Sequence, residues 1–100
     1  MAESLIRFAR RYGPYQITSS CRSRREQASL YRHRAENPFP VARPGHSMHE
    51  KGLAIDMGRA DIDPFSDLTL HAIGASWRAT DPSLRWSETD PVHFEWFPGD

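Results

Sequence analysis

Apolar residues recur every three or four positions in three stretches, which predicts amphipathic helices at residues 3–13, 24–35 and 66–77. Gly13 is expected to stop the first helix, because glycine is common just after a helix end. The second helix begins with a capping box, since Ser23 and Glu26 stand three positions apart. For the third we expect Ser66 as the N-cap, with Asp67 favourable at the positive end of the helix.

Alternation and a high content of β-branched and aromatic residues predict three strands, at residues 15–20, 52–58 and 92–97. In the second strand the larger apolar side chains share one face, whereas Asp56 points to the other. The third strand repeats this arrangement, because His93 and Glu95 lie opposite its apolar face. Both strands therefore direct a polar, metal-competent residue away from their apolar side. Segments 37–47, 59–65 and 80–91 are predicted to be loops.

The length of 100 residues predicts a single domain over residues 1–100. Because 38% of the chain is apolar and 11% is aromatic, we expect it to fold and not to stay disordered. The one cysteine, Cys21, excludes an internal disulfide and a cysteine-based zinc finger, and we expect it to be a small buried residue. No stretch approaches the roughly 20 apolar residues of a membrane span, so we expect no membrane insertion. The N-terminus also lacks the apolar core of a signal peptide.

The formal net charge is zero, but the two halves of the chain differ. Residues 1–45 hold nine arginines against three glutamates, and residues 46–100 hold four basic residues against ten acidic ones. A basic half can bind nucleic acid. No known nucleic-acid motif lies among these arginines, so we favour neutralisation between the halves or solvated helix faces.

Candidate chemistry centres on His49, Asp56 and His93, which provide a set of two histidines and one carboxylate. A catalytic zinc site uses three such protein ligands and leaves a position for water. Zinc lowers the pKa of that water towards about 7 and polarises a carbonyl group. A general base is still required, for which Asp90 is the first candidate and Glu88 a weaker one. Spacing alone is not specific, because a chain with five histidines contains many such pairs.

The other histidines are weaker ligand candidates. His46 lies near the proposed site in a Pro-Gly loop, whereas His33 and His71 lie on predicted helices and are expected at the surface. Glu95 has two readings. It can hold the second ring nitrogen of a ligand histidine, which is a common outer-shell arrangement, or it can be a plain surface carboxylate.

Three segments, read together, resemble the D-alanyl-D-alanine carboxypeptidase, or VanY-like, family of zinc peptidases. "PGHSMHEKGLAIDMG" is similar to the family signature Ser-x-His-x-x-Gly-x-Ala-x-Asp, and "DPVHFEW" resembles the motif that carries the last zinc-binding histidine. "SSCRSRREQASLY" is similar to the Ser-Gly-Tyr-Arg-Ser-x-x-x-Gln-x-x-Leu-Tyr segment that precedes them. The segments occur in family order and cover residues 17–97.

The resemblance implies a fold, a cofactor and a substrate class. The fold would be α+β, a small antiparallel sheet with about three helices packed on it, as in the hedgehog zinc domain. The cofactor would be Zn²⁺, bound by His49, Asp56 and His93, with Asp90 as the general base. Family members cut peptides of bacterial peptidoglycan, and they include carboxypeptidases and phage endolysins that cleave between L-alanine and D-glutamate.

The resemblance also implies roles for residues around the zinc ligands. Arg22 matches the family arginine, expected to bind substrate and stabilise the developing oxyanion. Gln27 matches a glutamine with a supporting or substrate-facing role, and Ser47 matches the signature serine near the metal and substrate. Gly52 would let the backbone pass close to the strand, and Ala54 would leave room beside the metal.

The chain departs from the family pattern in three places. Asp90 stands where many carboxypeptidases have glutamate, which weakens the strict carboxypeptidase subtype but not activity. Ser20 and Cys21 replace the usual glycine and tyrosine before Arg22. Residues 60–85 form a short stretch between motifs, which predicts reduced loops and an open cleft able to admit cross-linked wall polymer.

The functional prediction is a zinc peptidase acting on peptidoglycan stem peptides, of the D-Ala-D-Ala carboxypeptidase or L-Ala-D-Glu endopeptidase type. The alternative is a non-catalytic module of the same fold that binds the cell wall or a partner, which would not need an acid at Asp90. A nucleic-acid binder that uses the arginine-rich half is a third, weaker reading. We expect a monomer that acts on the bacterial wall and binds no nucleic acid.

Overall fold

The computed structural model describes residues 2–19 and 22–97, so the expectations for Ser20 and Cys21 fall outside the described residues. Within that part of the chain, three helices, four strands and two short 3₁₀ turns are formed. In order they are α1 (Ala2–Ala9), β1 (Gln16–Ser19), α2 (Arg24–Arg32), a 3₁₀ turn (Arg34–Glu36), β2 (Ala54–Gly58), a second 3₁₀ turn (Pro64–Ser66), α3 (Leu68–Ala79), β3 (Leu84–Arg85) and β4 (His93–Trp96).

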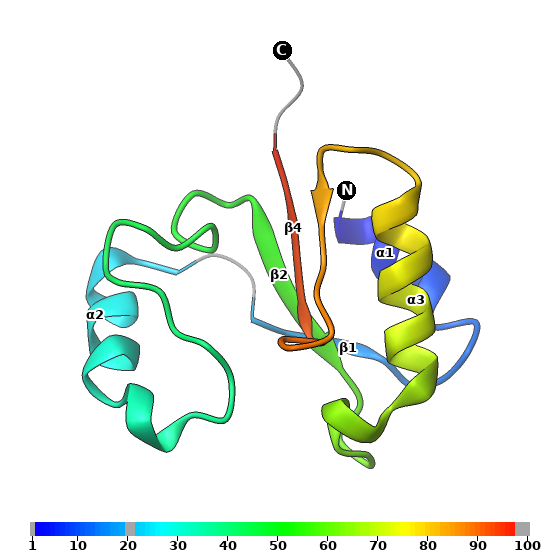
Figure 1. Ribbon diagram of the computed structural model, residues 1–100, viewed down its shortest axis with the longest axis horizontal. Helices are drawn as coiled ribbons and strands as arrows, with labels where there is room; N and C mark the ends of the chain where they lie inside the picture. The colour runs from blue at the N-terminus through cyan, green and yellow to red at the C-terminus, as the bar shows by residue number, and fades with distance from the viewer. Residues whose placement is uncertain (1, 20–21, 98–100) are drawn as a thin grey trace.

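The four strands form one antiparallel sheet in the order β1-β2-β4-β3, so β2 and β4 are its central strands (Figure 1). Their register places Asp56 directly opposite His93. On the other side of β2, Ser19 is paired with Asp56, with an irregularity in the pairing between Ile17 and Ser19. The register therefore gathers the polar residues of three elements at one place on the sheet.

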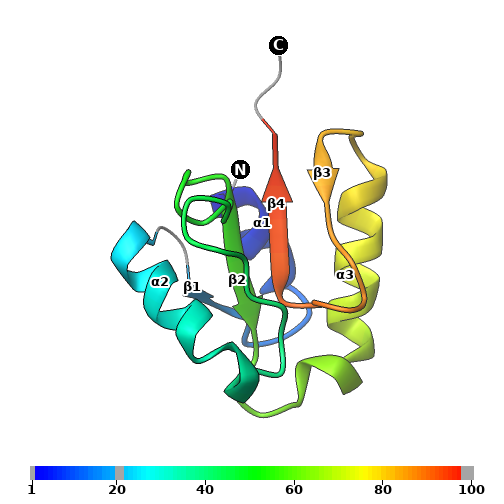
Figure 2. The same cartoon turned by 60° about the vertical axis from the view of Figure 1, so that its left-hand side comes forward.

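The helices lie on both sides of this sheet. Figures 1 and 2 show α1 and α3 on one side and α2, with the green loop that follows it, on the other. The expected α+β fold, a small antiparallel sheet with three helices, is confirmed. The three helices differ in their packing, because only α1 and α3 lie on the side of the sheet that carries the hydrophobic core.

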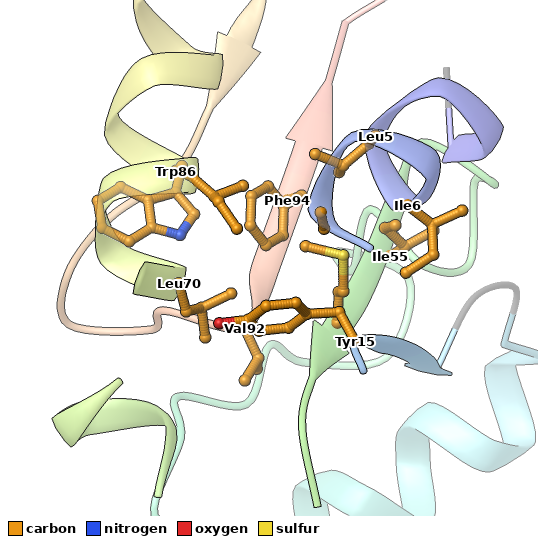
Figure 3. Close-up of a cluster of buried hydrophobic side chains, with 11 residues drawn as sticks. Leu5, Ile6, Tyr15, Ile55, Leu70, Trp86, Val92 and Phe94 are labelled. Carbon is orange, nitrogen blue, oxygen red and sulfur yellow. The ribbon is translucent and has the colours of Figure 1, made fainter. Parts of the chain in front are cut away.

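The core is built between the apolar face of the sheet and the two helices α1 and α3 (Figure 3). Ile55 and Met57 of β2 and Phe94 of β4 are buried there, as the alternation predicted. The cluster consists of Leu5, Ile6, Ala9, Tyr15, Ile55, Met57, Leu70, Ile73, Trp86, Val92 and Phe94. Because the core fills one face of the sheet, the opposite face is left for Asp56 and His93.

Helix α2 is held by polar contacts more than by the core. Its predicted capping box is present, with Ser23 accepting from the Glu26 backbone and Glu26 accepting from the Ser23 backbone. Gln27 is its one buried residue, and His33 is its C-cap, ahead of a separate 3₁₀ turn. The helix therefore ends earlier than the predicted residue 35.

The N-cap of α3 is Asp67, so the prediction of Ser66 was wrong. Pro64–Ser66 instead form a 3₁₀ turn whose first residues are capped by Asp63. Asp67 Oδ1 accepts a hydrogen bond from the Leu70 backbone at 3.0 Å, which starts the helix. Its Oδ2 accepts a buried hydrogen bond from the Tyr15 hydroxyl at 2.8 Å. Asp67 therefore both starts α3 and ties it to the segment that leads into β1.

Strand β3 lies in the segment 80–91 that was predicted to be a loop. Its two residues, Leu84 and Arg85, pair with Trp96 and Glu95 of β4. Two residues are too few to show a periodicity, so the pairing depends on β4 and not on a local pattern. In the part of the chain that the structure describes, no helix is long and apolar enough to cross a membrane.

The arginines of the first half remain mostly in solvent. Arg22 is half-buried and joins the two halves through an ion pair with Asp56, whereas the other described arginines of residues 1–45 are exposed. Of the two readings of the charge asymmetry, the structure therefore favours solvated faces over neutralisation between the halves.

Candidate metal centre

Three side chains converge on the face of the sheet opposite the core. His49 comes from the turn before β2, Asp56 from β2 and His93 from β4. His49 Nε2 lies 3.1 Å from Asp56 Oδ1 and 3.2 Å from His93 Nδ1, and His93 Nδ1 lies 3.3 Å from Asp56 Oδ1. The structure thus brings together the three ligands named from the sequence, as the only such group among its described residues.

The triangle of donor atoms fits a zinc ion. A tetrahedral ion bonded at about 2 Å to nitrogen and oxygen requires its ligand atoms to lie about 3.3 Å apart. The three observed separations, 3.1, 3.2 and 3.3 Å, match this within small side-chain movements. Two histidines and one carboxylate also leave the fourth position open, as a catalytic zinc site requires.

The turn that carries His49 is shaped by its neighbours in the signature. Ser47 is buried, and its hydroxyl accepts a hydrogen bond from the His49 backbone at 3.2 Å. Gly52 has a φ of +70°, a conformation that residues with a side chain rarely adopt. From the sequence we expected Gly52 to let the backbone pass close to the strand. The structure gives a different reason for a glycine at this position, namely its positive φ. The turn therefore places the imidazole of His49 over Asp56.

Asp56 is oriented by a contact on its other oxygen. Arg22 Nη2 donates to Asp56 Oδ2 at 3.0 Å, while Asp56 Oδ1 faces the two imidazoles. Arg22 also donates from Nε to Ser19 Oγ at 3.2 Å and from Nη1 to Gln27 Oε1 at 3.1 Å. Gln27 in turn donates to the Ala42 carbonyl at 2.8 Å. The family resemblance implied that Arg22 binds substrate and that Gln27 has a supporting or substrate-facing role, but it did not predict this connected chain of hydrogen bonds.

His93 is oriented by Glu95, which settles the two readings of that residue. His93 Nε2 lies 2.8 Å from Glu95 Oε1, so in the tautomer that donates from Nε2 to this carboxylate, Nδ1 has the lone pair that a metal ligand needs. Without an ion, a protonated Nδ1 donates to Asp56 Oδ1 at 3.3 Å. Burial lowers the pKa of His93, but the hydrogen bonds to Asp56 and Glu95 outweigh it and raise that pKa. Burial would likewise raise the pKa of Asp56, yet the hydrogen bonds from both histidines hold it well below its usual range.

Asp90 lies beside the triangle and lines the same pocket. Its Oδ1 is buried and, among the described residues, has no hydrogen-bond partner. Burial raises the pKa of Asp90 to about 6, an effect that the positive charge of His93 opposes. A half-buried carboxyl whose pKa is near neutrality, and whose buried oxygen accepts no hydrogen bond from the described residues, is suited to accepting and returning a proton. Glu88, the weaker candidate, is exposed and does not line this pocket.

The pocket over the triangle has a volume of about 370 Å³ and is closed on one side by α2 and the loop after it. Arg22, Gln27 and Ser47 all line it. His46 is exposed at its rim and takes no part in the ligand group. His71 was expected at the surface but is half-buried, with Nε2 at 3.1 Å from the Pro64 carbonyl and its ring edge against Trp86.

The fold and the three convergent side chains form a candidate site for one metal ion on an α+β scaffold. A family model for VanY, D-alanyl-D-alanine carboxypeptidase, matches residues 1–97, so the chain belongs to this family. This agrees with the resemblance found in the sequence motifs. None of the curated proteins compared with the chain is significantly similar to it.

The solved structures that share the fold include the following two. One is the vancomycin-resistance D,D-dipeptidase VanXYg in complex with a D-Ala-D-Ala phosphinate analogue, with 23% identity, a TM-score of 0.65 and 95% of this chain covered. The match covers 47% of VanXYg, so this chain spans about half its length. The other is a mutant of the D,D-pentapeptidase VanY from a VanB-type resistance cassette in complex with Zn(II). It has 19% identity, a TM-score of 0.62, and coverage of 95% of this chain and 67% of that chain.

Proposed function

We propose that the chain is a zinc-dependent peptidase that hydrolyses stem peptides of bacterial peptidoglycan. His49, Asp56 and His93 would hold the ion, and Asp90 would act as the general base. The observation that carries the proposal is the triangle of ligand atoms with a buried, unpartnered carboxylate oxygen beside it. Membership of the VanY family and the D-Ala-D-Ala phosphinate analogue bound to one structural neighbour support this substrate class, and the Zn(II) bound to the other supports the metal.

Each residue then has a chemical task. Zinc, when bound, supplies polarisation of the scissile carbonyl and a lower pKa for a coordinated water, towards about 7. Asp90 accepts the proton from the attacking water at its carboxylate and returns it to the leaving amine. Glu95 keeps the proton of His93 on Nε2, so that Nδ1 remains a ligand.

Arg22 has a positioning task in this proposal. Three of its nitrogens are already engaged by Ser19, Gln27 and Asp56. A guanidinium has five N–H groups, so one N–H on each terminal nitrogen remains for the pocket. The main role of Arg22 in this proposal is therefore to orient Asp56. Its charge and its remaining donors would also stabilise an oxyanion that develops beside it.

Mass spectrometry of muropeptides tests the proposal. Purified muropeptides are incubated with the zinc-loaded protein and with an equally loaded Asp90→Asn variant. We expect new fragments, whose masses identify the cleaved bond, from the wild-type protein and almost none from the variant. Muropeptides that bind but stay intact would support the non-catalytic wall-binding module instead. Equal hydrolysis by the variant would remove Asp90 from the mechanism.

A further inference from the structure

The segment of residues 22–51, which contains α2 and the loop that leads to β2, carries an excess of positive charge. It holds seven basic residues and three acidic ones, whereas residues 52–97 hold three basic and eight acidic ones. One basic residue of the segment, Arg22, forms the ion pair with Asp56. The other six are exposed and form no ion pair with the described residues, and we call them the α2 basic surface: Arg24, Arg25, Arg32, Arg34, Arg43 and Lys51.

The three glutamates of the segment form no ion pair with this surface, because each has a local partner. Glu26 accepts a hydrogen bond from the N-cap backbone of α2 at 3.2 Å. Glu50 accepts from the Gly45 backbone with both oxygens, at 2.9 and 3.0 Å. The carboxylate of Glu36 lies 3.7 Å from the ring of His33. The guanidinium groups of the α2 basic surface are therefore available to an anion from outside the molecule.

The α2 basic surface reaches the rim of the pocket over the triangle. Ala42 lines this pocket, and Arg43 follows it directly. The Arg43 carbonyl accepts a hydrogen bond from the backbone of His46, a rim residue, at 3.0 Å, so both lie in one turn. Arg24 lies against the same turn, because its Nη2 is 3.1 Å from the position that a β-carbon would take at Gly45. A ligand bound to Arg24 and Arg43 would therefore lie beside the pocket.

Along α2 the basic surface continues away from the pocket. Arg25 and Arg32 are two helical turns apart, so they share a face of α2 and lie about 10 Å apart along its axis. The guanidinium of Arg34 stacks on the Tyr31 ring, 4.1 Å from its centroid. A guanidinium can donate two parallel hydrogen bonds to one phosphate group. Arginines spaced along a surface are therefore suited to a chain of repeated phosphate groups.

The surroundings of these cations favour a polyanion without aromatic bases. Proteins that bind single-stranded nucleic acid combine a positive groove with aromatic side chains on which bases stack. The exposed large hydrophobic side chains of the described residues all lie outside the segment 22–51. Within the segment, Tyr31 is half-buried and covered by Arg34. The α2 basic surface therefore offers charge and hydrogen-bond donors without exposed aromatic rings for stacking.

We infer that the α2 basic surface binds an anionic phosphodiester polymer of the bacterial cell wall and holds the protein beside its peptide substrate. The inference rests on the proposed function only for the choice of the wall as the source of the polymer, because binding requires no hydrolysis. A polymer attached to the same wall would lie along α2 while a stem peptide enters the neighbouring pocket. The attraction is electrostatic, so salt should weaken it.

Binding is measured by calorimetry on the zinc-loaded protein, with poly(glycerol phosphate) as the probe, at salt concentrations of about 50 and about 200 mM. We expect the dissociation constant to rise about tenfold between the two concentrations, as for a protein that contacts two or three phosphates. The double variant Arg32→Gln/Arg43→Gln removes two cations of the surface. It should raise the dissociation constant at least about tenfold at the lower salt concentration.

Arg7→Gln/Arg11→Gln is the matched control, because it removes the same charge from two exposed positions. Arg7 lies on α1 and Arg11 just after it, and Figures 1 and 2 show α1 and α2 on opposite sides of the sheet. The dissociation constant of this control should stay within about twofold of the wild-type value, because salt screens distant charges. Melting temperatures of both zinc-loaded variants close to that of the wild type would show that each is folded.

Equal weakening by the two double variants would make net charge the cause and overturn the inference, as would a failure of poly(glycerol phosphate) to bind at the lower salt concentration. Single-stranded DNA of equal charge that binds more tightly than poly(glycerol phosphate), and depends on the same two arginines, would assign the surface to nucleic acid instead. Failure of the proposed function is a separate result. If the wild-type protein hydrolyses no muropeptide, polymer binding that depends on Arg32 and Arg43 would still establish the surface.

Discussion

At the scale of single residues, the two oxygens of Asp56 have different partners. Oδ1 faces His49 and His93, and Oδ2 receives a hydrogen bond from Arg22. A carboxylate held in this way presents one oxygen to a metal and cannot rotate to present both. We therefore expect the affinity of the site for a metal ion to depend on Arg22 as well as on His49, Asp56 and His93.

Replacing Arg22 should weaken metal binding. Arg22→Met removes the donor to Asp56 Oδ2, and losses of 10- to 100-fold in affinity are typical when such an outer partner is removed. We expect the dissociation constant for zinc, measured by competition with a chromophoric chelator, to rise by about that factor. Arg22→Lys should not restore it, because one ammonium cannot span Ser19, Gln27 and Asp56.

Arg25→Met is the matched control for this experiment, because Arg25 is an exposed arginine three residues after Arg22, in the first turn of α2. Its zinc affinity should equal that of the wild-type protein. An Arg22→Met variant with normal zinc affinity and a raised KM would instead assign Arg22 to substrate alone, as the sequence motif suggested.

The protonation of Asp90 should determine the pH below which kcat/KM falls. Because burial raises its pKa to about 6, the carboxylate is ionised and able to accept a proton above that pH, and protonated below it. We expect kcat/KM to fall as the pH drops through about 6, and not near the usual aspartate value of about 4. Asp90→Asn should lower kcat by about 10²- to 10⁴-fold at pH 7 with zinc affinity retained.

Two further variants separate a proton-transfer role of Asp90 from a structural one. Asp90→Glu keeps a carboxylate, so it should retain part of the activity that Asp90→Asn loses. Glu88→Gln changes an exposed acid in the same loop and should behave as wild type. A pH profile of Asp90→Glu that matches Asp90→Asn in shape and level would contradict proton transfer at this position.

At the scale of elements, the contact between Tyr15 and Asp67 joins α3 to the start of β1. Burial and the hydrogen bond to Asp67 raise the pKa of Tyr15 to about 12, so the folded state favours the neutral phenol. The resulting stability is fully present below about pH 10, the pKa of an unfolded tyrosine, and it is lost as the pH rises towards 12. We expect the free energy of unfolding to fall by about 2–3 kcal/mol over that interval.

Urea denaturation at a series of pH values between 8 and about 11.5 would measure this loss. Tyr15→Phe should be less stable at neutral pH by about 1–3 kcal/mol, because Asp67 Oδ2 loses its buried donor. The same variant should lack the alkaline decline that Tyr15 causes. A decline of the same size in Tyr15→Phe would show that another group is responsible.

The sequence could predict the central elements because their pattern was local. The alternation in β2 and β4 already placed Asp56 and His93 opposite an apolar face, whereas their direct pairing in the sheet is known only from the structure. The contacts of Arg22 with Asp56 and of Gln27 with Ala42 could not be predicted, since they join residues 34 and 15 positions apart with no periodic signal. The two-residue β3 was too short to leave a pattern of its own.

At the scale of the whole molecule, the three candidate ligands lie on segments that the core alone does not hold together. His49 lies in a turn outside the main hydrophobic cluster, whereas β2 and β4 form the middle of the sheet. A metal ion bound to all three would tie the loop side of the molecule to the sheet. Because the unfolded chain lacks this arrangement, binding to the folded state should stabilise it.

Zinc should therefore raise the melting temperature. A free zinc concentration of 100 times the dissociation constant corresponds to about 2.7 kcal/mol of stabilisation. In differential scanning calorimetry we expect an upward shift on zinc addition that EDTA reverses. His49→Gln should lose this shift, whereas His46→Gln, an exposed histidine three positions earlier in the same segment, should keep it. An equal shift in both variants would mean that zinc stabilises the fold elsewhere, and the triangle of His49, Asp56 and His93 would then not be the metal site.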